Sequence, residues 1–110
     1  METLAICAWI TCQDRTQAFS IGHILVEEGL AACVNILDNM ESIYRWQGGI
    51  ETAREAVLVV KTRACHTSAL TTRVRELHSY EVPCIICLPI VDGSPEYLAW
   101  IAASTREPLQ

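Results

Sequence analysis

The sequence predicts an α+β fold in which an antiparallel sheet carries helices on one face. Apolar segments of strand length alternate along the chain with segments of helical periodicity, and residues that favour turns or helix caps separate them. The chain has 110 residues, and 51% of them are hydrophobic. That length suits one domain, residues 1–110, with a core of its own, and residues 104–110 are expected to fray.

The first half of the chain is expected to form a strand, a helix and a long hairpin. The strand covers residues 4–11, and the helix begins after Asp14 and stops at Gly29, which tolerates the left-handed conformation. Residues 30–62 then run out and back around a turn at Gly48-Gly49. The strand segments within this hairpin are 30–36, 42–46 and 55–62.

The second half is expected to add a helix, a strand and a last helix. A helix capped by Thr67 or Ser68 must end before Pro83, because proline lacks the amide hydrogen that a helix needs. Residues 84–91 form the fourth strand, and Pro95 opens the C-terminal helix. The order strand, helix, strand, strand, helix, strand is the split βαβ plan of ferredoxin-like domains, and that plan supports many functions.

The charge of the chain argues against two classes of partner. Thirteen acidic and eight basic side chains give a formal net charge of −5, so neither nucleic acid nor an anionic membrane surface is expected to bind. The longest apolar runs, such as residues 84–91, are far shorter than the roughly 18 residues of a membrane span. The first ten residues contain no Lys or Arg, unlike a secretory signal, so a cytoplasmic location is expected.

The chain contains six cysteines, and they lie mainly within apolar runs. Reduced and mostly buried thiols are therefore favoured over a disulfide framework, with Cys7, Cys33 and Cys87 assigned to the core. Cys84 and Cys87 have the spacing of a CxxC pair. In a strand these two positions point to opposite faces, so the pair is not expected to hold one metal ion.

Six segments of the sequence carry a resemblance to a known family. They occur in the order "LVEEGLAACVNI" (25–36), "SIYRWQGGIE" (42–51), "VVKT" (59–62), "ELHSYEVP" (76–83), "LPIVDG" (88–93) and "YLAWI" (97–101). In order and spacing they resemble the CutA family, the divalent-cation tolerance proteins. The resemblance covers about residues 6–103, almost the whole chain.

The resemblance implies a cytoplasmic, ferredoxin-like homotrimer linked to tolerance of copper and other divalent metals. It implies no established enzymatic reaction and no required cofactor. It also implies a cleft between subunits lined by polar and aromatic groups, which fall in this sequence on Tyr44, Trp46, Lys61, His78, Tyr80 and Glu81.

The sequence departs from the family pattern at two places. Pro83 is followed by Cys84, where the family usually has glutamate. In members credited with copper binding, the ligands resemble a first-strand thiol and adjacent histidines; here Ile10 matches the thiol, and His78 matches one histidine. Cys12, which follows Ile10 on the same strand face, is a candidate substitute. The predicted metal ligands are His78, joined by Cys12 or Cys84 where these lie within reach.

Each of these residues also has an ordinary structural interpretation. His78 suits a metal ligand or general base, but equally a hydrogen-bonded residue at a helix C-terminus. Glu81 is either a ligand or the partner of an arginine, and Lys61 either binds an anion or pairs with a glutamate. Tyr44 and Tyr80 either contact a ligand or pack.

The expected function is a non-enzymatic homotrimer that binds copper, a related metal ion or a small molecule in the inter-subunit cleft. The long hairpin supports self-association, because its free edges need cover, and high thermal resistance is expected of such an assembly. The alternative is a small acylphosphatase-like hydrolase, but "TCQDRT" (11–16) supplies Arg15 without a glycine to help cradle a phosphate. An RNA-binding module of the same fold would need a basic surface, which this acidic composition does not favour.

Overall fold

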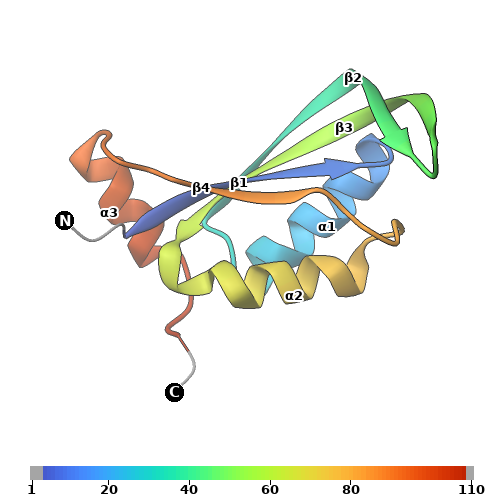
Figure 1. Cartoon of the computed structure of the whole chain (residues 1–110). Coiled ribbons are helices and arrows are strands. Elements are labelled where there is room, and N and C mark those ends of the chain that lie inside the picture. Colours follow the sequence, from blue (N-terminus) through green and yellow to red (C-terminus); the bar gives the residue numbers. More distant parts are fainter. Residues whose placement is uncertain (1–3, 109–110) are drawn as a thin grey trace.

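The computed structural model describes residues 4–108, so the predicted fraying of residues 109 and 110 lies outside the described part. The elements follow in the predicted order: β1 (Ala5–Cys12), α1 (Arg15–Glu27), β2 (Cys33–Trp46), β3 (Gly49–Arg63), α2 (Thr67–Leu77), β4 (Ile85–Pro89) and α3 (Pro95–Ala103), with a short 3-10 turn (Ala64–His66) before α2. The strands form one antiparallel sheet in the order β2-β3-β1-β4 (Figure 1). No helix among the described residues is both long enough and apolar enough to span a membrane.

The sheet has one covered and one open face. Helices α1 and α2 lie together on the covered face, while α3 lies at one end of the sheet (Figure 1). Side chains alternate between the faces of a strand, and in β1 the residues Ile6, Ala8 and Ile10 are buried under the helices. Trp9, between them, points to the open face and keeps 39% of its surface exposed. The core therefore lies on one side only, and the α+β ferredoxin-like prediction is confirmed.

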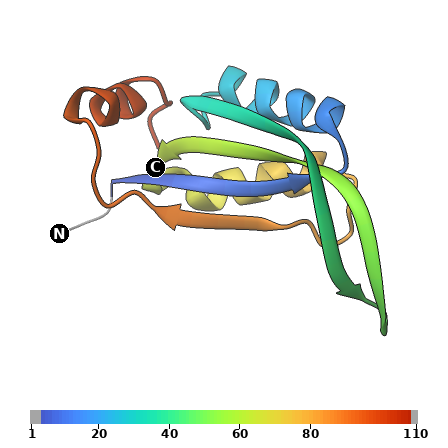
Figure 2. The ribbon, with the colours of Figure 1, turned by 90° about the horizontal axis from the view of Figure 1, so that it is seen from above.

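The hairpin formed by β2 and β3 is longer than the rest of the sheet. These strands have 14 and 15 residues, whereas β1 has eight, so the distal part of the hairpin pairs only with itself. The register shifts between Leu37 and Met40, and Asn39 has a positive φ of 57°, which marks a bulge. Beyond the bulge, residues 40–55, which we call the arm, curve away from the domain (Figure 2).

The turn of the hairpin lies one residue earlier than predicted. Trp46 pairs with Gly49, and the two residues between them, Gln47 and Gly48, have φ values of 48° and 83°. Two successive positive φ values are the pattern of a type I′ turn, which matches the twist of the flanking strands. Gly49 is already the first residue of β3, so the prediction of a Gly48-Gly49 turn was wrong by one position.

Hydrogen bonds connect the first residues after α3 to the rest of the fold. Thr105 is 9% exposed and accepts a hydrogen bond from Nε of Arg63 over 2.8 Å. The backbone of Arg106 donates to the carbonyl of Gly29 over 2.8 Å, and its own carbonyl lies 2.8 Å from Nε2 of the buried His66. Residues 105 and 106 are therefore hydrogen-bonded to the rest of the fold, and the fraying expected of residues 104–110 stays a prediction.

Candidate functional site

Residues 78–84 connect α2 to β4 and carry most of the predicted site. Helix α2 ends at Leu77, and the amide of His78 closes its last turn on the carbonyl of Val74 over 2.9 Å. The backbone of His78 itself is extended, and Pro83 keeps the chain from forming a further helical turn. The segment thus leaves the helix and passes the end of β1, where the carbonyl of Cys84 accepts from the amide of Thr11.

Both ring nitrogens of His78 are engaged within the chain. Nδ1 accepts a hydrogen bond from the amide of Tyr80 over 3.0 Å, so the proton of the neutral ring belongs on Nε2. Nε2 then donates to the carbonyl of Thr11 over 2.7 Å. Of the two interpretations of His78, the structure realises the hydrogen-bonded one, and a metal ion would have to displace one of these two partners.

Tyr80 links this segment to the base of the arm. Its hydroxyl donates to Oε2 of Glu55 over 2.6 Å, and Glu55 is only 6% exposed. Burial raises the pKa of Tyr80 above its usual range, and the hydrogen bond to Glu55 and the charge of Glu55 raise it further. The phenol therefore stays protonated and acts as a fixed donor to the carboxylate.

Glu55 was not predicted as a site residue. A signal was present, because Glu55 directly precedes the apolar run Ala56–Val60 of β3, where a carboxylate is unusual. The sequence did not indicate that the partner of this carboxylate is Tyr80, which lies 25 residues later along the chain.

A cavity of about 800 Å³ lies between the arm and residues 79–84. Its lining consists of Thr11, residues 41–44, Trp46, Glu55, residues 79–82 and Cys84, and we call it the Tyr80 cavity. Among the predicted cleft residues, Tyr44, Trp46, Tyr80 and Glu81 line this cavity. A second cavity of about 740 Å³ lies beside α3 and contains none of the predicted site residues in its lining.

Lys61 lies away from the Tyr80 cavity. In β3 it pairs with Cys7 of β1 and Cys33 of β2, well along the strand from Glu55. Its Nζ donates to the side-chain carbonyl of Asn35 and lies 5.9 Å from the ring centroid of Tyr97. Within this chain Lys61 therefore meets an amide and an aromatic ring, and neither Tyr80 nor Glu81.

The predicted copper ligands do not come together in one chain. Cys12 is fully buried in the core, and burial raises the pKa of its thiol to about 12, with the charges of Asp14 and Glu55 adding to the effect. The thiolate is the form that binds metals, so Cys12 is a poor ligand where it stands. Cys84 lines the Tyr80 cavity, whereas His78 does not. Within residues 4–108 no three His, Cys, Asp or Glu side chains converge as a metal-binding group.

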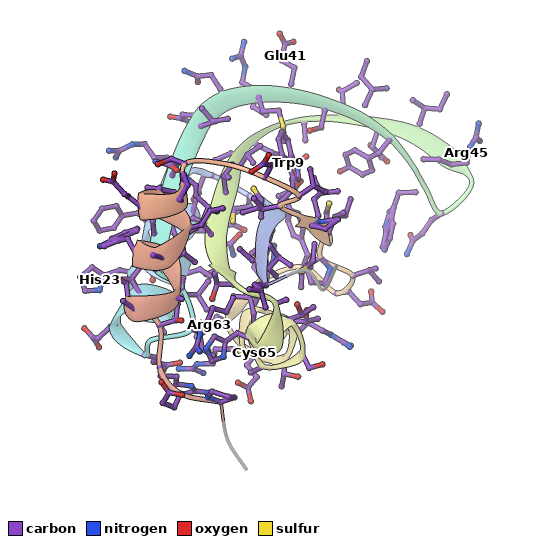
Figure 3. The ribbon with its side chains drawn as sticks, turned by 90° about the vertical axis from the view of Figure 1, so that its left-hand side faces the viewer. Trp9, His23, Glu41, Arg45, Arg63 and Cys65 are labelled. Carbon is purple, nitrogen blue, oxygen red and sulfur yellow. The ribbon has the colours of Figure 1, made fainter. Side chains whose placement is uncertain are left out.

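The Tyr80 cavity is acidic and aromatic. Its lining contains no Lys, Arg or His, and Glu55 takes part in no ion pair among the described residues. Glu41 borders the cavity but points outward from the arm, and Arg45 lies at the far end of the arm (Figure 3). Glu55 and Glu81 are the other two carboxylates in the lining.

The loop between β1 and α1 shows no sign of a phosphate site. Asp14 caps α1 by accepting from the amide of Gln17 over 2.8 Å. Arg15 is the one basic residue of segment 11–16 and would have to bind the phosphate in an acylphosphatase-like hydrolase. It is the exposed first residue of that helix. A carboxylate at the cap disfavours an anion at the same helix end, because the two negative charges repel.

Comparisons with known proteins agree on one family. The family model described as "CutA1 divalent ion tolerance protein" matches residues 6–104. A protein CutA homolog of Xenopus laevis is 48% identical over 94 residues, which are 86% of this chain and 62% of that protein. The chain thus spans less than two thirds of the length of this relative.

Two further comparisons cover nearly complete chains. The divalent-cation tolerance protein CutA of Thermus thermophilus is 47% identical over 96 residues, which are 87% of this chain and 93% of that protein. The crystal structure of CutA1 from Oryza sativa superposes with a TM-score of 0.92 at 39% identity and covers 96% of both chains. The family model and the relative from Thermus thermophilus are both named for tolerance of divalent ions. By sequence and by fold, the chain belongs to the CutA1 divalent ion tolerance protein family.

Proposed function

We propose that this protein is a non-enzymatic homotrimer that binds a cation in the Tyr80 cavity, with the neighbouring copy completing the cavity. The observation that carries the proposal is the buried carboxylate of Glu55 at the base of an arm that pairs only with itself. The carboxylate provides a charge for a cation, and the arm provides a surface for a second copy.

Self-association is supported by the exposed apolar surface of the sheet. On the open face, Trp9 keeps 39% of its surface exposed, although its strand β1 is central in the sheet. Ile86 and Leu88, on the edge strand β4, keep 51% and 50% exposed. On the arm, Ile43 and Ile50 are 76% and 67% exposed. Apolar patches of this kind mark contact surfaces, and closed cyclic assembly covers them without forming open fibres.

A cationic ligand is supported by the charge of the cavity and by the names of the relatives. The lining is acidic, and the relative from Thermus thermophilus is called a divalent-cation tolerance protein. A divalent metal ion is therefore the first cation to test, and copper stays among the candidates. Copper binding through His78, Cys12 and Cys84 stays a prediction that needs His78 to give up a hydrogen bond and Cys12 to leave the core.

The assembly is tested by light scattering on the purified protein at micromolar concentration. We expect the mass of three chains for the wild type and for Phe19→Glu, since Phe19 lies on α1 with 56% of its surface exposed. Ile86→Glu, at 51% exposure on the open face, should dissociate the trimer, because it places a charge in the proposed interface. A monomeric wild type, or a trimer indifferent to Ile86→Glu, contradicts the proposed assembly.

The ligand site is tested by isothermal titration calorimetry. Copper and other divalent metal ions are titrated into the wild type, Glu55→Gln and Glu96→Gln. The second variant removes one charge from the exposed first turn of α3, away from the cavity, and serves as the control. Glu55→Gln alone should weaken binding about tenfold or more, because a charged ligand group is lost. If neither these metal ions nor an organic cation binds the wild type, the proposed function is wrong.

A further inference from the structure

We propose that the ligand of the Tyr80 cavity is an organic ammonium ion, held by the charge of Glu55 and by the aromatic rings around it. This inference rests on the proposed cation site and specifies its ligand. It follows from three features of the cavity: a carboxylate without a cation, a set of aromatic rings, and a donor set that does not suit a metal.

The first feature is the incomplete pairing of Glu55. Its side chain is more than nine-tenths buried, with 6% of the residue exposed, and it lines the cavity. Oε2 accepts from the neutral hydroxyl of Tyr80, whereas Oε1 has no hydrogen-bond partner among the described residues and is not fully buried, so a ligand can reach it. No Lys, Arg or His among them forms an ion pair with it. A largely buried carboxylate without a counter-charge attracts a cation, and the accessible Oε1 offers that cation a free acceptor.

The second feature is the aromatic lining. Tyr44, Trp46 and Tyr80 all border the cavity. Tyr44 and Trp46 are 43% and 41% exposed, so neither ring is buried in the core of this chain. The faces of aromatic rings are electron-rich and attract cations, most strongly when the cation is a weakly hydrated ammonium group. An alkylated ammonium ion satisfies both the carboxylate and the rings.

The third feature is that the cavity lacks a set of ligands suited to a metal ion. Calcium and magnesium bind sets of about six or more oxygen ligands, and copper and zinc prefer imidazole and thiolate groups. No three potential ligands converge among residues 4–108, and His78 does not line the cavity. The volume of about 800 Å³ lies in the range of small-molecule sites, and one metal ion would fill little of it.

The test uses choline as the probe and 3,3-dimethylbutan-1-ol as its neutral isostere, titrated by calorimetry into the assembled protein. The two molecules have the same shape and differ in charge. We expect saturable binding of choline, with the neutral isostere at least about tenfold weaker, because Glu55 and the rings act on the charge. Equal binding of both probes, or no saturable choline binding, overturns the proposal.

Variants distinguish the contribution of the Glu55 carboxylate to choline binding from that of the aromatic rings. Glu55→Gln keeps an oxygen acceptor for the hydroxyl of Tyr80, and it should weaken choline binding about tenfold or more. Trp46→Leu should weaken it by about two- to thirtyfold, whereas Trp100→Leu on α3, at 45% exposure against 41% for Trp46, should leave it unchanged. Tyr80→Phe keeps the ring and frees both oxygens of Glu55, so choline should bind at least as tightly as in the wild type. This last variant tests the charge even if Glu55→Gln does not fold.

Failure of this inference can be told apart from failure of the proposed function. If divalent metals bind through Glu55 and choline does not, the cation site stands and the ammonium ligand is wrong. If neither binds, both proposals fall. If choline binds only after Arg45→Ala, a basic side chain at the end of a neighbouring arm already fills the cavity, and the occupant is a second copy of this chain.

Discussion

Thr62 carries a buried hydroxyl without a hydrogen-bond partner among the described residues. The residue is fully buried on the covered face of β3, where an unpaired polar group destabilises the fold. Thr62→Val replaces the hydroxyl by a methyl group of similar size. We expect the free energy of unfolding in urea to rise by about 1 kcal/mol.

The matched control is Thr71→Val. The hydroxyl of Thr71 donates to the carbonyl of Thr67 over 2.9 Å, so its removal gains nothing and should be neutral or destabilising by up to about 1 kcal/mol. Equal effects at both positions would show that the missing partner of Thr62 is not the cause.

His66 should make stability depend on pH. Burial lowers its pKa below the usual value, and the positive charges of Arg63 and Arg106 act in the same direction, against the opposing effect of its hydrogen bond to the Arg106 carbonyl. The unfolded chain therefore takes up the proton first as the pH falls. The contribution of His66 to stability is complete above the unfolded pKa of about 6.5 and is lost as the pH falls through the lower folded pKa.

This pH dependence is measured by urea unfolding between pH 8 and pH 4. His66→Gln retains a side-chain amide that can donate to the carbonyl of Arg106 but does not titrate, so the variant should lose less stability than the wild type over this interval. His23→Gln removes an exposed imidazole that lies 3.8 Å from Glu27 and serves as the control. If His66→Gln and the wild type follow the same pH curve, His66 does not titrate with unfolding.

At the residue scale, the sequence predicted side-chain chemistry better than side-chain partners. Tyr44, Trp46, Tyr80 and Glu81 were predicted together and line one cavity. Glu55 was missed because the pairing of its carboxylate with Tyr80 depends on how two distant segments cross, which periodicity does not encode. The same limit applies to Lys61, whose partners depend on strand register.

At the scale of elements, Gly29 is expected to be the most sensitive glycine outside the hairpin turn. Its φ is +75°, and an added Cβ would lie 2.9 Å from Cβ of Arg106. Gly29→Ala should therefore lower the free energy of unfolding by at least about 1–2 kcal/mol, because both the left-handed backbone and the close approach oppose a side chain.

Gly49→Ala is the appropriate comparison for Gly29→Ala. At Gly49 the nearest atom to an added Cβ is the carbonyl oxygen of Trp46 at 3.9 Å, which is an ordinary contact. Its effect should stay within about 0.5 kcal/mol. Equal losses at the two positions in urea unfolding would contradict the assignment of Gly29 as a helix stop.

The sequence predicted the order and the type of the helices and strands, but it misplaced some of their boundaries. Strands 4–11 and 84–91 were each placed within two residues at either end, because apolar runs and prolines mark them. The distal part of β3 was missed because residues 49–54 are mostly exposed and contain no apolar run. Hydrogen bonds to β2, and not a buried face, make them a strand. The turn was misplaced because a positive φ at Gln47 is not expected of glutamine.

At the scale of the whole molecule, the proposed assembly should couple folding to association. If the arm and the open face are covered only in the trimer, the folded state gains stability with concentration by mass action. We expect the thermal midpoint to rise when the protein concentration is raised a hundredfold, and to be high for a chain of this size. Ile86→Glu should have a lower midpoint that no longer depends on concentration.

The contacts of Arg106 have a consequence for the order in which the chain can complete its fold. The imidazole of His66, at the start of α2, finds its acceptor 40 residues later in the sequence, on the far side of β4 and α3. A chain that lacks residues 104–110 can still close the sheet-and-helix core, but it then holds a buried donor with no partner. Arg106 supplies the missing acceptor and connects the ends of α1 and β3 to the same segment of backbone. A purified chain truncated after residue 103 should accordingly be cleaved by protease near the start of α2, and a chain ending at residue 108 should resist.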